Sequence, residues 1–478
     1  MIEISRNTSK ALADAQLQRN LNFALSHTLE ARDRVVAEVE NWEELRRHAR
    51  RVKAHTMARL DHYLEELEDR IQDKGGQVIW CRNGREATDF ITALARRKGI
   101  RQVIKSKSMT GEEIHLNQAL QEAGVEPVET DLGEYIVQLA GQAPSHIIAP
   151  ALHLSRSQVG DLFMEKLGTE RSQDPARITA QARQVLRQRF VRAEMGISGV
   201  NFAVAESGTL VVVENEGNAR LSMSAPRIHL ALMGIEKVIP RGADLSVFLK
   251  LLIRSATGQK MSSYLNFIQG ARQPGETDGP EEFYLLLLDN GRSRILADKA
   301  LRQTLYCLRC GACQNVCPVY QRIGGHAYGS TYQGPIGAIL TPQLLSMGQA
   351  PEHPFASTLC GACTQACPVQ IEIPQILLEL RRRLKQKVQK TKRLQHTFFR
   401  LWAWTMRSPG RCRILSRRGS SVMRLAQGSK FVRGSLAPWR RWSRRRELPK
   451  VPAQSFRESY LDWNRRRTAA NQRPPLEK

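Results

Sequence analysis

The 478-residue sequence lacks several features that would indicate a function directly. No apolar run approaches the ~20 residues that a membrane-spanning helix needs, and the N-terminal stretch has no apolar core of a signal peptide. Residues 75–298 contain no G-x-G-x-x-G, no G-x4-G-K-[ST] and no His-x3-His pair, so the common nucleotide-binding and mononuclear metal motifs are excluded there. We therefore expect a cytoplasmic protein whose chemistry lies elsewhere in the chain.

Acidic residues are scarce at the C-terminal end. Residues 381–478 hold 29 Lys+Arg against 4 Asp+Glu, whereas the rest of the chain holds 43 against 42. The net charge of +26 thus belongs to this tail. Tryptophan and phenylalanine lie among its arginines, as in HTFFRLWAWTMR and PWRRWSRRR (438–446), which suits a peripheral contact with the inner face of a membrane. An acidic protein subunit is the alternative partner, and nucleic acid is the least favoured because no RNA-binding motif is present.

Seven of the nine cysteines fall in two short bursts. The first, CLRCGACQNVCP (307–318), has the C-x2-C-x2-C-x3-C-P spacing of two-cluster iron–sulfur proteins, in which the fourth cysteine ligates the other cluster. The second, CGACTQACP (360–368), repeats this motif without its first cysteine. Zinc sites usually use two separated pairs of ligands, and disulfides need an oxidising compartment. The bursts therefore predict two 4Fe-4S clusters.

Crossed ligation distributes seven thiolates over two clusters. Cluster one takes Cys307, Cys310, Cys313 and Cys367, and cluster two takes Cys317, Cys360 and Cys363. Ser357 stands three residues before Cys360, where the missing cysteine would be. The fourth ligand of cluster two is then Ser357, a neighbour such as His353, water or nothing, and a 3Fe-4S or incompletely ligated cluster is an alternative. We expect cluster one to be the robust relay and cluster two the labile or substrate-facing one.

Periodicity divides the chain into four parts. Residues 1–74 are typical of helices, interpreted as a solvent-facing arm or a subunit contact. Residues 75–298 alternate β-rich runs with helices, which predicts an α/β domain with a mostly parallel sheet. Residues 299–385 form the helical two-cluster module, and 386–478 form the basic tail. The expected strands are 77–80, 101–105, 125–130, 146–150, a hairpin within 201–217, 227–234, 237–241 and 282–289.

The polar candidates in the α/β domain are scattered. One group crosses a strand-to-helix junction, where α/β sheets bind anions through helix N-terminal amides: Lys105, Ser106, Lys107, Ser108, Thr110, Glu112, Glu113 and His115. The structural alternative, a capping box of Thr110 and Glu113, is favoured. A second group, Glu206, Ser207 and Thr209, either forms a site or shapes a turn. The side chains expected to be merely buried are His146, His153, His229 and Cys81.

Three stretches together resemble one family: ESGT (206–209), CLRCGACQNVCPVYQRIGGHAYGSTYQGPIGAILTP (307–342) and STLCGACTQACPVQIEIP (357–374). The sequence is similar to the lactate utilisation protein B family. The resemblance implies an α/β LUD domain, similar in fold to the NagB/RpiA/CoA-transferase superfamily, followed by a two-cluster ferredoxin-like module. It implies the same seven cysteine ligands, and the serine at position 357 is shared with the family pattern.

Members of this family act with two partners, the A and C components, to oxidise L-lactate to pyruvate independently of nicotinamide. The resemblance therefore implies an electron-transfer component, without a transferable catalytic residue. Lactate would need Arg or Lys and a base, and the 105–115 junction is the best candidate. The alternative is that the LUD domain is itself an enzyme on a small anionic, phosphorylated or acyl substrate, with structural or sensory clusters. A redox-sensitive nucleic-acid binder is the third hypothesis.

Overall fold

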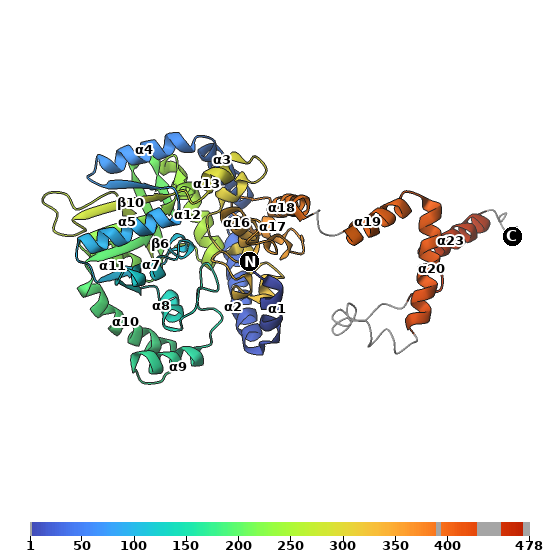
Figure 1. Ribbon diagram of the computed structural model, residues 1–478, viewed down its shortest axis with the longest axis horizontal. Coiled ribbons are helices and arrows are strands. Elements are labelled where there is room, and N and C mark those ends of the chain that lie inside the picture. The colour runs from blue at the N-terminus through green and yellow to red at the C-terminus, as the bar shows by residue number, and fades with distance from the viewer. Residues whose placement is uncertain (1, 389–392, 428–450, 472–478) are drawn as a thin grey trace, which may run out of the picture. The chain divides into compact units, whose positions relative to one another are not determined.

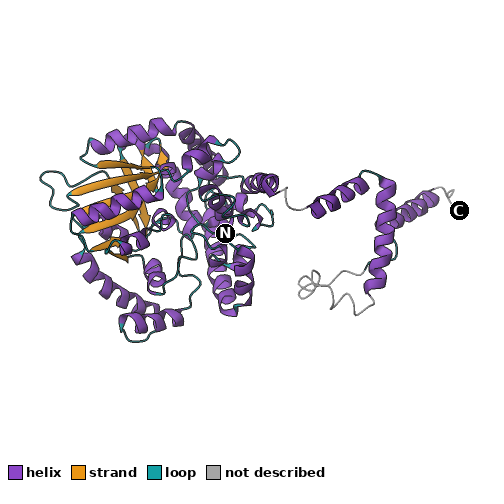
Figure 2. Ribbon diagram, viewed as in Figure 1, coloured by secondary structure: helices purple, strands orange, loops and turns teal. Residues whose placement is uncertain are grey.

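The computed structural model describes residues 2–388, 393–427 and 451–471 (Figure 1). The chain folds as two compact units, Met1–Lys385 and Gln386–Lys478. The first unit holds both β-sheets and the seven clustered cysteines, and its strands lie among helices (Figure 2). The predicted segment 438–446 lies outside the described residues.

Four helices form at the N-terminus as predicted: α1 (Ile4–Ala13), α2 (Ala15–Ala37), α3 (Trp42–Ala58) and α4 (Leu60–Gln72). They are packed on the body, because Leu21, Trp42 and Ile71 are buried in its core. The guanidinium of Arg46 on α3 donates hydrogen bonds of 3.0 and 2.8 Å to the carbonyl oxygen of Cys367. The interpretation as a solvent-facing arm is therefore corrected: these helices support the cysteine region.

The larger sheet has six strands, all parallel, in the order β1-β10-β7-β4-β2-β3. Its strands are β1 (Gln77–Cys81), β2 (Gln102–Lys105), β3 (Glu126–Glu129), β4 (Met195–Gly199), β7 (Ile228–Gly234) and β10 (Glu282–Leu288). The apolar runs of β7 and β10 are buried, as expected for strands covered on both faces. The sequence did not predict β4, whose five residues MGISG include two glycines.

The predicted strand at 146–150 is a loop in the structure, so that prediction is wrong. The ring nitrogen Nδ1 of His146 accepts hydrogen bonds from the amides of Ile148 and Ala149, both 3.1 Å long. These amides are consequently not available to a strand ladder, and Pro150 has no N–H to donate.

A second sheet of four strands has the order β8-β5-β6-β9. Its strands are β5 (Phe202–Val204), β6 (Thr209–Glu214), β8 (Val238–Ile239) and β9 (Tyr264–Ile268). The antiparallel pair β5/β6 is the predicted hairpin, connected by the 3-10 turn η1 (Ala205–Ser207). Gly208 follows with φ of 65°, and a Cβ there would lie 2.7 Å from Cβ of Arg70. Both the positive φ and the close approach therefore require glycine.

Helices lie around the sheets, and the cysteine region lies at one end of the same unit (Figure 1). They are α5 (Gly84–Arg97), α6 (Met109–Glu113), α7 (Leu116–Glu122), α8 (Leu132–Leu139), α9 (Arg156–Leu167), α10 (Pro175–Arg192), α11 (Asn218–Ser224), α12 (Gly242–Thr257) and α13 (Arg292–Ala297), with η2 at Ile235–Lys237. One hydrophobic core contains Phe248 of α12 and Leu285 of β10 together with Cys310, Cys363 and Cys367. The cysteine region is thus packed against the α/β part.

The cysteine region consists of short helices, as predicted. They are η3 (Arg302–Tyr306), α14 (Ala312–Asn315), α15 (Tyr320–Ile323), η4 (His326–Tyr328), α16 (Gly334–Leu344), η5 (His353–Phe355), α17 (Ala362–Ala366) and α18 (Ile373–Val388). The second unit contains α19 (Arg393–Met406), α20 (Pro409–Gln427) and α23 (Phe456–Asn471). None of the helices in the described ranges is long and apolar enough to cross a membrane.

Candidate functional site

The two cysteine bursts have the same backbone conformation. Arg309 and Leu359, each one residue before a cysteine, have φ of 62° and 60°. Gly311 and Gly361, each one residue after it, have φ of 72° and 85°. A side chain other than glycine is unusual at positive φ, so its occurrence at matching positions marks an internal repeat. Each turn then leads into a short helix, α14 or α17.

Within this repeat, Ser357 occupies the position of Cys307. The amide of Arg309 donates to Sγ of Cys307 at 3.4 Å, and the amide of Leu359 donates to Oγ of Ser357 at 3.1 Å. The other candidate ligand, His353, is buried, and its Nε2 lies 3.1 Å from Oγ of Ser330. The repeat therefore favours Ser357 over His353 as the residue that replaces the missing cysteine.

The structure brings the four cysteines assigned to cluster one together around one small cavity: Cys307, Cys310, Cys313 and Cys367. Burial raises the pKa of Cys310 to about 12 and that of Cys367 to about 11. The amide of Ile371 donates to Sγ of Cys367 at 3.4 Å. Such thiols are inert without a metal, whereas a cluster takes the place of their protons. The residues present therefore fit an iron–sulfur cluster with crossed ligation.

The cysteines assigned to cluster two form a more open group. Burial and the neighbouring Cys317 and Cys360 raise the pKa of Cys363 to about 12. Cys360 is exposed, and a hydrogen bond from the amide of Ala362 is the main cause of its lowered pKa. In the described ranges, no three His, Cys, Asp or Glu side chains are grouped as ligands of a single metal ion.

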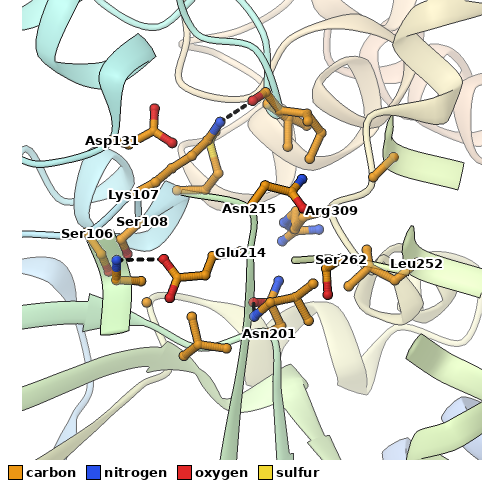
Figure 3. A pocket seen from close by; sticks show the side chains of 18 of the residues that line it. Ser106, Lys107, Ser108, Asp131, Asn201, Glu214, Asn215, Leu252, Ser262 and Arg309 are labelled. Atoms are coloured by element: carbon orange, nitrogen blue, oxygen red, sulfur yellow. Dashed lines mark hydrogen bonds between the residues drawn. The ribbon is translucent and has the colours of Figure 1, made fainter. Parts of the chain in front are cut away.

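A pocket of about 300 Å³ lies between the α/β domain and the first burst (Figure 3). Its walls include residues 106–110 after β2 and residues 199–201 at the end of β4. The chain leaves these neighbouring strands in opposite directions along the sheet, since β2 leads to β3 and β4 leads to β7. Such a switch point at the carboxyl ends of parallel strands is the usual ligand site of an open α/β sheet.

Half of the predicted junction reaches this pocket. Four of its residues line the pocket, Ser106, Lys107, Ser108 and Thr110. Lys105 lies outside it, in a buried ion pair of 2.6 Å with Glu129. The predicted capping box is wrong, because Oγ of Ser108, rather than Thr110, accepts the amide of Gly111 at 3.1 Å. Glu112 and His115 are likewise absent from the pocket lining.

The residues of the ESGT turn have structural roles. Oε2 of Glu206 accepts a hydrogen bond of 3.0 Å from the amide of Gly242. Oγ of Ser207 donates a hydrogen bond of 2.8 Å to Oγ1 of Thr209. The interpretation of these residues as turn-forming is the one that fits.

The three histidines and Cys81 are structural, as predicted. Burial lowers the pKa of His146 to about 4 and that of His229 to about 3. His153 contacts Oγ of Ser145 at 2.8 Å, and Cys81 is buried.

Sequence reasoning missed the charged residues that the cysteine region and η2 contribute to the pocket. Arg309 lies between two cluster-one cysteines, and Lys237 follows β7; both line the pocket, as does Tyr332. The guanidinium of Arg309 lies 4.8 Å from the ring centroid of Tyr332. The difference between the two bursts could have revealed Arg309, because the first burst has arginine where the second has Leu359.

These cations belong to a buried network around Glu236. Arg292 donates to the Glu236 carboxylate at 2.5 Å and to Glu113 at 2.8 Å, and Arg309 donates to Glu236 at 3.2 Å. Burial alone would raise the pKa of Glu236, but Arg292 and Arg309 outweigh it and hold the pKa at about 2. Burial also lowers the pKa of Lys237 to about 8. The network is thus an interior concentration of positive charge beside the first burst.

Comparison with known proteins places these features in one family. The sequence profile of the LUD domain matches residues 64–288, and that of the 4Fe-4S dicluster domain matches residues 303–371. Proteins named lactate utilization protein B from Bacillus thuringiensis (strain Al Hakam), Bacillus cereus (strain AH187) and Bacillus anthracis (strain CDC 684 / NRRL 3495) are each 42% identical over 451 residues, covering 94% of this chain and 95% of theirs. The chain belongs to the lactate utilization protein B family.

Membership in the lactate utilization protein B family confirms the α/β fold with a LUD domain, the 4Fe-4S clusters and a role as an iron–sulfur protein of lactate utilisation. The exact domain boundaries and the assignment of each cysteine stay predictions. A crystal structure of a DUF162 family protein from Deinococcus radiodurans aligns with 48% of this chain and 98% of its own, at 14% identity and a TM-score of 0.26.

Proposed function

We propose that this protein is the iron–sulfur electron-transfer component of a multi-protein system that oxidises L-lactate to pyruvate without nicotinamide. Its partners in this proposal are the A and C components of the lactate utilisation system. The observation that carries the proposal is that the pocket and the cavity of the cluster-one cysteines share lining residues. Ile147 and Arg309 line both the pocket and the small cavity of the four cluster-one cysteines. A cluster held by these four cysteines would lie next to the pocket and could accept electrons from a substrate bound there.

Electrons would then pass from the pocket to cluster one and on to cluster two. Cys317, assigned to cluster two, is the last cysteine of the first burst. Burial is the main cause of the raised pKa of Cys313 in cluster one, and the nearby Cys363 of cluster two contributes to it. Cys360 is exposed, so the second cluster would meet a partner or acceptor at the surface. Because the pocket borders the first burst, this proposal makes cluster one, rather than cluster two, the centre nearer to the substrate.

The test is lactate-dependent reduction of the anaerobically reconstituted protein, followed by low-temperature EPR with and without the two partners. We expect reduced-cluster signals only when lactate and the partners are present. Colourless protein without iron after reconstitution would overturn the proposal. Lactate turnover by this chain alone would instead support the alternative in which the LUD domain is itself the enzyme.

We further propose that the tail attaches the protein to an anionic membrane surface. In its described part, α19 exposes Phe398, Phe399, Trp402 and Trp404; it carries an arginine at position 400, and two more follow the helix at positions 407 and 411. Aromatic rings at the headgroup boundary and cations near phosphate favour such a surface. The full chain should co-sediment with phosphatidylglycerol vesicles and not with phosphatidylcholine vesicles. The double variant Trp402→Ser/Trp404→Ser should lose this binding; unchanged sedimentation would favour an acidic protein partner.

A further inference from the structure

The interior beside the first burst contains more positive than negative side chains. Four cations are buried there, Lys53, Lys237, Arg292 and Arg309, and the most exposed of them, Lys237, is only 9% exposed. Two carboxylates face them, Glu113 and Glu236. Uncompensated buried charge is costly, so the excess of basic side chains over carboxylates points to an anion that completes the site.

Two of these cations line the pocket and have hydrogen-bonding capacity to spare. Nη1 of Arg309 is buried and has no hydrogen-bond partner within the described residues. The guanidinium makes one ion pair, to Glu236 at 3.2 Å. Lys237 makes neither a hydrogen bond through its ammonium group nor an ion pair within 4 Å in the same part of the chain. By contrast, Lys53 donates to the carbonyl oxygen of Glu236 at 2.5 Å and lies outside the pocket lining.

The carboxylates of the pocket do not neutralise this pair. Each of the three accepts a hydrogen bond from a backbone amide. The donors are Glu134 for Asp131 at 3.0 Å, Leu132 for Glu216 at 3.0 Å and Ala219 for Glu214 at 2.7 Å. All three therefore serve helices α8 and α11 as acceptors for amide groups at their N-terminal ends. None forms an ion pair with Arg309 or Lys237.

We propose that Arg309 and Lys237 bind the carboxylate of a small organic acid in this pocket, next to the cysteines of cluster one. A guanidinium and an ammonium together offer the charge-assisted hydrogen bonds that a carboxylate accepts best. Apolar side chains such as Ile147, Val200 and Leu252 line the same pocket and suit a short carbon chain. The identification of this acid as L-lactate or its 2-oxo product rests on the proposed function; the carboxylate site itself rests on the geometry.

The cluster is the competing source of negative charge. The amide of Arg309 contacts Sγ of Cys307, and a cysteine-ligated cubane is itself anionic. If the surplus serves only the cluster, removal of any nearby buried cation should act alike. If it serves a carboxylate, only the two cations of this network that line the pocket, Lys237 and Arg309, should matter. Lys53 is therefore the matched control, since it is a buried cation of the same network outside the pocket.

The experiment is anaerobic isothermal titration calorimetry of the full-length reconstituted protein with L-lactate, pyruvate and the uncharged analogue L-lactamide. Variants are Lys237→Met, Lys237→Arg, Arg309→Met and Lys53→Met, each checked for iron content and visible absorption. We expect lactate or pyruvate to bind the wild type and lactamide not to bind. Lys237→Met and Arg309→Met should weaken binding about tenfold or more, while Lys237→Arg retains most of it and Lys53→Met leaves it unchanged.

Several results would overturn the inference. They are absence of acid binding to the wild type, equal binding of lactamide, unchanged affinity in Lys237→Met, and equal losses in Lys53→Met and Lys237→Met. This readout is independent of electron transfer. Lactate-dependent reduction with the partners that persists fully in Lys237→Met would overturn the carboxylate site and leave the proposed function standing. Protein that holds no iron but still binds lactate, with this binding lost in Lys237→Met, would overturn the proposed function and leave the carboxylate site standing.

Discussion

The two cysteine bursts share one backbone and differ in their surroundings. In the first, Cys310 is buried in the main hydrophobic core, and position 309 carries an arginine that lines the pocket. In the second, Cys360 is exposed, and the matching position carries Leu359. The potential of an iron–sulfur cluster depends on nearby charge, hydrogen bonds to sulfur and solvent exposure. A duplicated motif can thus give two centres with separate tasks, one facing a ligand and one facing the surface.

The two bursts should differ most when each loses one cysteine ligand. Cys310→Ser should abolish lactate-dependent reduction of both clusters and lower the thermal unfolding midpoint, because it removes a ligand from the interior core. Cys360→Ser should remove cluster two while lactate still reduces cluster one, with little change in the unfolding midpoint. Iron analysis, EPR and thermal denaturation of both variants measure this. Equal loss of fold in the two variants would contradict the distinction between an interior and a surface centre.

A second prediction concerns the buried charge network around Glu236, beside the first burst. Glu236→Gln should lower the free energy of unfolding by about 3–5 kcal/mol, since it removes the buried carboxylate that pairs with Arg309 and leaves Arg292 with Glu113 alone. Glu379 is the control: its pKa is also about 2, held down first by hydrogen bonds from Arg382, but it is partly exposed on α18. Solvent screening should limit the effect of Glu379→Gln to about 1 kcal/mol or less.

The pH dependence of the Glu236 contribution has a defined sign. The pKa of Glu236 in the folded protein, about 2, lies below the ordinary value of 4.5. Its stabilisation is therefore complete above about pH 4.5 and is lost as the pH falls towards 2. Urea unfolding of wild type and Glu236→Gln should converge in this window. A difference that stays constant from pH 5 to 2 would show that the carboxylate is not the titrating group.

The sequence predicted the elements whose signals are local. The cysteine spacing, the buried runs of β7 and β10 and the hairpin at Gly208 each determine their structure within a few residues. The predictions failed where distant residues decide. The loop at 146–150 is fixed by the His146 ring, which also contacts Asn315 of the cysteine region at 2.9 Å. The N-terminal helices likewise pack on the cysteine region, which lies far from them in the sequence, so they are not the solvent-facing arm that the sequence predicted.

The candidate site was half predictable for the same reason. Residues 106–110 follow a strand, so their place at the edge of a parallel sheet could be inferred from sequence. Lys237 and Arg309 are 72 residues apart in number and meet only through the tertiary fold. No spacing rule connects them. Whether a buried cation has a partner is likewise a property of the assembled interior and cannot be read from its neighbours in the chain.

A third prediction concerns position 357, where the second burst has serine and the first has Cys307. Ser357→Cys should give cluster two a fourth thiolate, because Oγ of Ser357 takes the same amide hydrogen bond as Sγ of Cys307. We expect about eight irons per chain and slower loss of the second cluster in air, measured by iron analysis and by the EPR signal of three-iron clusters. Ser357→Ala is the control. If Ser357→Ala already matches Ser357→Cys, position 357 does not face the cluster.

The smallest expected effect comes from exchanging the residue types at the matching positions 309 and 359. Leu359→Arg places a guanidinium at the position that Arg309 has in the first burst, where φ is the same within 2°. A cation stabilises the more negative reduced cluster, so the midpoint potential of cluster two should rise. Arg309→Leu, titrated without any organic acid, should lower the potential of cluster one by more, because Arg309 is buried whereas Cys360 beside Leu359 is exposed and water screens the added charge. Redox titrations followed by EPR measure both shifts. Equal and opposite shifts would mean that the two sites have the same dielectric surroundings, and the difference between them would then lie in ligation alone.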